Sequence, residues 1–216
     1  MKQLAITLLL LIAQLLTNVH AADCEVDRVL VDPVTNVMTV HTKKRMLTDR
    51  VNGFVGRVWG GGASEVLMRA VSEGENRFVS IEVRLLRTYS SSPSDEDLHE
   101  ALYIKKGAGL SVLMEDDSVV KLYADRDARA KAEYAIDTDG NYGVDARVTG
   151  LYTLDADSAG ALTSGAAMVI RVAVESGHLG LSGRENSINF GTNSKSKYFF
   201  KDAVTCLQQD HSVEST

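Results

Sequence analysis

Apolar and polar residues alternate along much of this chain with a period of two. In residues 78–85, for example, the even positions carry Phe, Ser, Glu and Arg, and the odd positions carry Val, Ile, Val and Leu. Alternate side chains of a strand point to opposite faces of a sheet. The pattern therefore predicts a half-buried antiparallel strand with its odd positions in a core.

Turn-forming residues divide the alternating runs into pairs, which predicts a series of β-hairpins. The expected pairs are residues 29–31 with 36–41, 66–72 with 78–89, 130–136 with 142–154, and 167–174 with 179–190. A further hairpin is expected within residues 113–123, where two β-prone runs flank the acidic turn 115–117. Most of the chain is thus expected to form antiparallel sheet.

Helical patterns are few and short. Residues 197–209 show the i, i+4, i+7, i+8 spacing of one apolar helix face, with Phe199, Ala203, Cys206 and Leu207. Single helical turns are expected at 94–99, after a proline, and at 158–164. The predicted fold class is mainly β: an antiparallel sandwich or barrel-like meander of hairpins with a short C-terminal helix.

The N-terminal segment has the layout of a secretory signal peptide. Lys2 precedes an apolar run over residues 4–16, and a short polar stretch then ends in the small residues Ala21 and Ala22. The run is shorter than the roughly 20 apolar residues that span a membrane. We therefore expect cleavage after Ala21 or Ala22, export to the periplasm or secretion, and no transmembrane segment in the mature chain.

The domain organisation expected from these patterns is simple. Residues 1–21 form the signal peptide, residues 22–209 a single β-rich domain, and residues 210–216 a polar, disordered tail. The serine-rich stretch near 90–95 is the alternative boundary, at which two β subdomains would meet.

Two cysteines, Cys24 and Cys206, lie near the two ends of the predicted mature chain. An even count in an oxidising compartment predicts a disulfide between them, which would make the first and last ordered elements neighbours. Lipid attachment to Cys24 is the alternative, but Asp23 before it is neither small nor apolar. A metal site is not favoured, because neither cysteine has a Cys or His partner at ligand spacing.

Charge narrows the range of partners. The formal net charge is −6, and the clusters of basic residues, such as 43–45 and 105–106, are all short. Nucleic acids and anionic membranes attract proteins with extended basic surfaces. We therefore expect no nucleic-acid partner; a protein, a peptide or an envelope component remains open.

The acidic segment 137–145 is the best candidate for an ion site. It offers oxygen ligands at alternating positions, as calcium prefers, from Asp137, Asp139, Asn141 and Asp145. It departs from an EF-hand loop, because Tyr142 stands at the sixth position and Val148 at the twelfth. Asp and Asn are also common in hairpin turns, so a plain turn is the favoured interpretation and a calcium site the alternative.

No local motif for catalysis is visible. The histidines outside the signal peptide are His41, His99, His178 and His211, and none forms a recognisable set with a nucleophile and an acid. We therefore predict no catalytic residue and no cofactor.

Two hypotheses of function follow. The first is an exported, non-catalytic module that binds a partner protein, a peptide or an envelope component through loops on a β scaffold. The alternative is an exported hydrolase whose site is assembled from dispersed residues. A deep polar pocket with a His–Ser or acid–acid pair would favour the hydrolase, whereas an exposed apolar patch or an unpaired sheet edge would favour the binding module.

Overall fold

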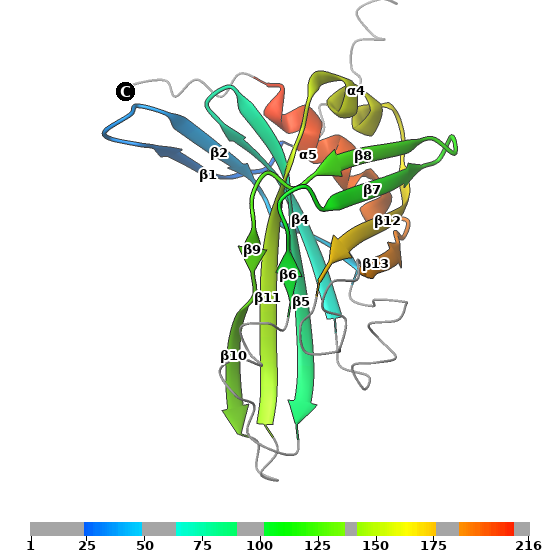
Figure 1. Ribbon diagram of the computed structural model, residues 1–216. Helices are drawn as coiled ribbons and strands as arrows, with labels where there is room; N and C mark the ends of the chain where they lie inside the picture. The colour runs from blue at the N-terminus through cyan, green and yellow to red at the C-terminus, as the bar shows by residue number, and fades with distance from the viewer. Residues whose placement is uncertain (1–23, 49–63, 90–101, 137–141, 176–185, 210–216) are drawn as a thin grey trace, which may run out of the picture.

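The computed structural model describes residues 24–48, 64–89, 102–136, 142–175 and 186–209 (Figure 1). Helical structure in these residues is limited to α4 (Ala156–Ser164), η2 (Ser196–Tyr198, a 3-10 turn) and α5 (Phe199–Leu207). The strands are β1 (Val26–Val31), β2 (Met38–Thr42), β3 (Arg45–Thr48), β4 (Ser64–Glu73), β5 (Asn76–Tyr89), β6 (Tyr103–Ile104), β7 (Gly109–Met114), β8 (Val119–Tyr123), β9 (Ala128–Arg129), β10 (Lys131–Ile136), β11 (Tyr142–Thr153), β12 (Ala167–Val174) and β13 (Asn186–Gly191).

The largest sheet runs in the order β1-β2-β4-β5-β11-β10, and β3 also pairs with β4. All of these pairings are antiparallel. The hairpin of β4 and β5 closes at Gly74, whose φ of +58° is easily adopted by a residue without a Cβ. Figure 1 shows β5, β10 and β11 as long strands that extend away from the remainder of the molecule.

A second sheet has the order β13-β12-β7-β8, and β6 pairs with β9 in a sheet of two strands. The turn between β7 and β8 is the predicted acidic one: Asp117 has a φ of 65°, and Asp116 accepts a hydrogen bond from the Ser118 amide at 3.0 Å. Four of the five predicted hairpins are confirmed as strand pairs. In the fifth, β12 pairs with residues 186–191, so Val174 lies opposite Asn186 and the connection is longer than the predicted turn at 175–178. Residues 179–185 of the predicted return strand lie outside the described residues.

The alternation of apolar and polar residues along β5 places its odd-numbered side chains in the hydrophobic core. Positions 79, 81 and 83 of β5 are fully buried, and they join the apolar residues of the second sheet and both helices in one hydrophobic cluster. On the other face, Phe78 and Ser80 are only 6% and 3% exposed, which the alternation did not predict. Phe78 lies opposite the buried Val71, so this end of the strand is covered on both faces. The polar face of β5 begins at Glu82.

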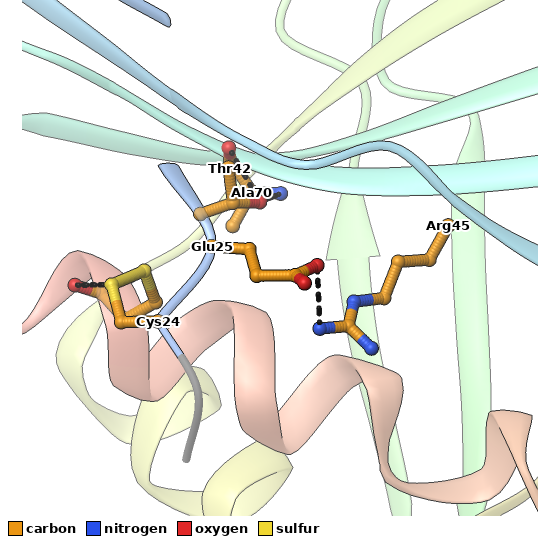
Figure 2. The surroundings of a disulfide bond; sticks show 6 residues. Cys24, Glu25, Thr42, Arg45 and Ala70 are labelled. Atoms are coloured by element: carbon orange, nitrogen blue, oxygen red, sulfur yellow. Dashed lines mark hydrogen bonds and ion pairs between the residues drawn. A yellow bond between two sulfur atoms is a disulfide. The ribbon is translucent and has the colours of Figure 1, made fainter. Parts of the chain in front are cut away.

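The predicted disulfide is confirmed. Cys24 and Cys206 are bonded with their Cα atoms 5.0 Å apart, which ties the segment before β1 to α5 (Figure 2). The predicted helix is also confirmed, although it begins at Phe199 after the η2 turn, and Phe200 rather than Phe199 is the fully buried aromatic residue. The guanidinium of Arg45 lies 5.1 Å from the centre of the Phe199 ring, a cation–π contact between β3 and α5.

The predicted fold class is confirmed: the described chain is mainly β, antiparallel, and ends in a short helix. The helical turn expected at 158–164 is α4, which Asp155 caps by accepting a hydrogen bond from the Ser158 amide at 2.7 Å. The signal peptide, the turn at 94–99, the boundary near 90–95 and the tail lie outside the described residues and stay predictions. Within the described ranges, no helix has the length and apolar character needed to cross a membrane.

Candidate functional site

The solvent-facing side of the largest sheet carries rows of charged side chains. The register places Arg84 of β5 between Glu65 of β4 and Arg147 of β11, and Arg147 opposite Lys131 of β10. Three cations therefore lie directly opposite one another across three strands. Like charges at such positions destabilise a sheet unless a counter-charge lies nearby.

Asp145 supplies most of that counter-charge. Its carboxylate accepts hydrogen bonds from Arg147 at 2.6 Å, and from Arg84 at 2.9 and 3.0 Å in a two-pronged geometry. Arg84 also donates to Glu65 at 2.9 Å. The hydrogen bonds from Arg147 and then Arg84 lower the pKa of Asp145 to about 2, and those from Asp145 and Glu65 raise the pKa of Arg84.

A polar groove of about 410 Å³ runs along this face, lined by Glu82, Arg129, Lys131, Glu133, Asp145, Arg147 and Thr149. Lys44 donates to Glu82 at 2.8 Å, and Arg129 lies 5.2 Å from the centre of the Tyr103 ring. Lys131 has no ion-pair partner within the described part of the chain. Chemically, the groove offers cations at which an anionic group of a ligand would be stabilised.

An acid–acid pair is present in this groove, because Glu133 of β10 lies directly opposite Asp145 of β11. Catalysis by paired carboxyl groups needs one of them protonated as a general acid. The two arginines keep Asp145 ionised, as its pKa near 2 shows. Asp145 is therefore suited to orienting guanidinium groups rather than to donating a proton.

Of the four residues in the calcium hypothesis, only Asp145 lies within the described chain. Asp137, Asp139 and Asn141 lie outside the described residues, so the site stays a prediction. Asp145 lies on β11, where Arg147 and Arg84 occupy its carboxylate. No group of three or more His, Cys, Asp or Glu side chains in the described ranges is arranged to hold a metal ion.

Of the histidines considered for hydrolysis, only His41 falls within the described chain. It lies on β2, opposite Arg28 of β1 and Val71 of β4. Burial, followed by the charges of Arg69 and Arg28, lowers the pKa of His41. Its Nδ1 is buried without a hydrogen-bond partner among the described residues. His99, His178 and His211 lie outside them.

The outermost strand of the largest sheet, β1, forms a second candidate surface. Within the described chain it pairs with β2 alone, so its other edge is unpaired. Val29, Leu30 and Val31 are 38%, 48% and 51% exposed. Proteins usually protect such an edge with charges, proline or a bulge. The bulge of β1 lies at its start, between Val26 and Arg28, so it does not interrupt the apolar residues 29–31.

The hairpin that presents this edge is held by Asp32. Asp32 Oδ1 accepts hydrogen bonds from the amides of Val34 at 2.7 Å and Thr35 at 2.9 Å, and its own amide donates to the Val37 carbonyl at 3.0 Å. The backbone bonds from Thr35 and then Val34 lower the pKa of the Asp32 carboxyl. Figure 1 shows the β1–β2 hairpin projecting from one side of the molecule.

Comparisons with protein-family models, curated proteins and solved structures return no match for this chain. Sequence reasoning missed both candidate surfaces as sites. The apolar run 29–31 was visible as a strand, but its place at a sheet edge depends on topology. The charge rows depend on the register between strands that lie far apart in the chain.

The variant Asp145→Asn is expected to lower the free energy of unfolding by about 1–2 kcal/mol near neutral pH, because Arg147 loses its ion-pair partner and Arg84 keeps only Glu65. The pKa of Asp145 in the folded protein, about 2, lies below the ordinary value of 3.8. Its contribution is therefore complete above that ordinary value and is lost as the pH falls through the folded value.

Urea denaturation at a series of pH values measures this effect. The difference between wild type and Asp145→Asn should close as the pH falls from about 4 to about 2. Glu133→Gln is the matched control, since Glu133 lies opposite Asp145 but has no ion-pair partner in the described ranges. A difference that persists unchanged in acid would show that the ion pairs are not its cause.

Proposed function

We propose that this protein is an exported, non-catalytic binding module that takes up an extended segment of a partner polypeptide at the edge of β1. The single observation that carries the proposal is the apolar edge formed by Val29, Leu30 and Val31, which has no strand partner on its outer side among the described residues. An incoming strand would gain backbone hydrogen bonds from this edge and cover its exposed side chains.

The backbone of β1 supports this mode of binding. The Asp32 amide bonds to Val37 of β2. Because antiparallel partners alternate, Leu30 and Arg28 also direct their backbone groups toward β2. The N–H and C=O groups of Val29 and Val31 therefore point outward, where a partner strand can bind them.

The hydrolase alternative has less support. Its best constellation is the acid–acid pair of Glu133 and Asp145, and Asp145 is held as a carboxylate by two arginines. The export of the protein, which rests on its N-terminal segment, forms part of the same proposal, and the disulfide is typical of an oxidising compartment.

Photocrosslinking in the cells that make the protein tests the proposal. With Leu30 replaced by p-benzoylphenylalanine, irradiation should join this position to an extended segment of a polypeptide, which mass spectrometry of the product locates. Val29→Pro should abolish the crosslink, because it removes an outward N–H without breaking a bond to β2. Val29→Thr keeps that N–H and serves as the control.

A crosslink that survives Val29→Pro unchanged would rule out strand addition at this edge. The absence of any crosslink from position 30, in a protein that is folded and oxidised, would refute the proposed function as a whole.

A further inference from the structure

The exposed edge is complementary to itself. Residues 28–32 read Arg28, Val29, Leu30, Val31 and Asp32: a cation, three β-forming apolar residues and an anion. Two copies of such a segment, paired antiparallel about a two-fold axis at Leu30, bring each cation opposite an anion. They also bring each apolar residue opposite an apolar one. A two-fold interface requires this kind of self-complementary surface.

The residues of β1 whose backbone N–H and C=O groups point outward also fit a pairing with the two-fold axis at Leu30. Val29 and Val31 carry the outward-pointing backbone groups, as the bond from Asp32 to Val37 determines. With the two-fold axis at Leu30, Val29 lies opposite the partner's Val31, and each pair can exchange both of its N–H···O=C bonds. Shifting the register by one residue would place an outward-pointing residue opposite one whose groups are already bonded to β2.

The two charges are available for pairing. Arg28 is exposed and has no ion-pair partner within the part of the chain that the structure describes. The Asp32 carboxylate accepts the turn's two backbone bonds at Oδ1 and also a hydrogen bond from the Thr35 side chain, and it has no ion-pair partner within the described residues. Arg28 and Leu30 project from the same face of β1, and Asp32 directly follows the strand, two residues after Leu30.

We propose that β1 pairs antiparallel with β1 of a second copy of this chain, with Arg28 opposite the partner's Asp32. This inference rests on the proposed function, because it names the strand that the edge accepts. The resulting dimer has one continuous sheet through both copies, and about five residues of each β1 meet at its centre. So short a contact predicts a reversible dimer with a dissociation constant in the micromolar range.

A charge-swap experiment on the purified, oxidised mature protein tests the dimer by analytical ultracentrifugation. Each single variant, Arg28→Asp or Asp32→Arg, places like charges opposite each other in its homodimer. Each should raise the dissociation constant of that homodimer by about tenfold or more. In a mixture of the two variants, one chain carries only acidic side chains at positions 28 and 32, and the other carries only basic ones. The mixture should therefore form a one-to-one heterodimer at least about tenfold tighter than the homodimer of either variant.

Because Asp32 also holds the turn, Asp32→Asn provides a second variant that keeps the Oδ1 acceptor and removes the charge. It should weaken the dimer while leaving the thermal unfolding midpoint unchanged. A cysteine in place of Leu30 should form a disulfide between copies, since the two-fold axis brings these Cα atoms within disulfide range. Val34→Cys, at a position that is 91% exposed but distant from the axis, should not.

Wild-type protein that stays monomeric at about 100 times the predicted dissociation constant would overturn the dimer. So would a mixture of charge variants that does not associate. Either failure, found together with a position-30 crosslink to a different polypeptide, would leave the proposed function standing. If the protein does not associate and position 30 forms no crosslink to any polypeptide, both the dimer and the proposed function are refuted.

Discussion

The double variant Cys24→Ser/Cys206→Ser is expected to unfold with a free energy about 3–5 kcal/mol lower than that of the wild type. The disulfide spans 182 residues of sequence, so its removal releases almost the whole domain from a constraint on the unfolded chain. For a domain of this size the thermal midpoint should fall by roughly 10 °C. Thermal and urea unfolding followed by circular dichroism measure both quantities.

Two controls distinguish the stability lost with the disulfide bond from the stability lost by changing the cysteine side chains. Cys206 is buried, so serine introduces a hydroxyl into an apolar site. The double alanine variant avoids that hydroxyl and should lose nearly as much stability. Wild-type protein unfolded in the presence of a reductant should match the alanine variant. If reduction left the unfolding midpoint in place, the disulfide would contribute nothing to stability.

The disulfide and the sheet content could be predicted because each depends on local or compositional signals. Alternation correctly identifies positions 79, 81 and 83 of β5 as core positions, although it does not predict the burial of Phe78 and Ser80 on the other face. The turn residues at 115–117 determine where β7 ends and β8 begins. The C-terminal helix follows from its apolar spacing. Its exact start does not, because the η2 turn shifts the buried aromatic position from Phe199 to Phe200.

The two candidate surfaces could not be predicted in the same way. Val29, Leu30 and Val31 form an apolar run of the kind that usually lies in a core, and only the strand order places them at an open edge. The run of Arg84, Arg147 and Lys131 across the sheet joins segments that are far apart in the chain, and its register is a property of the folded sheet. Periodicity along a chain does not contain that information.

Phe200→Ala is expected to lower the free energy of unfolding by about 3–5 kcal/mol, because it removes the largest buried side chain of α5 and leaves a cavity. Phe200 is 1% exposed and belongs to the core cluster that joins this helix to the sheets. Lys201→Ala, at the exposed neighbouring position, is the matched control and should change stability by less than about 0.5 kcal/mol. Urea unfolding of both variants provides the comparison.

Combining Phe200→Ala with the loss of the disulfide shows how α5 is held. If the disulfide acts on the unfolded chain while apolar packing alone keeps the helix docked, the two losses should add to within about 0.5 kcal/mol. We expect this additivity, because Phe200, Val204 and Leu207 form a buried apolar face of α5 that does not depend on the sulfur–sulfur bond. A combined loss more than about 1 kcal/mol smaller than the sum would mean that α5 already detaches when the disulfide opens. In that case the disulfide, rather than the core, would fix the helix beside β4.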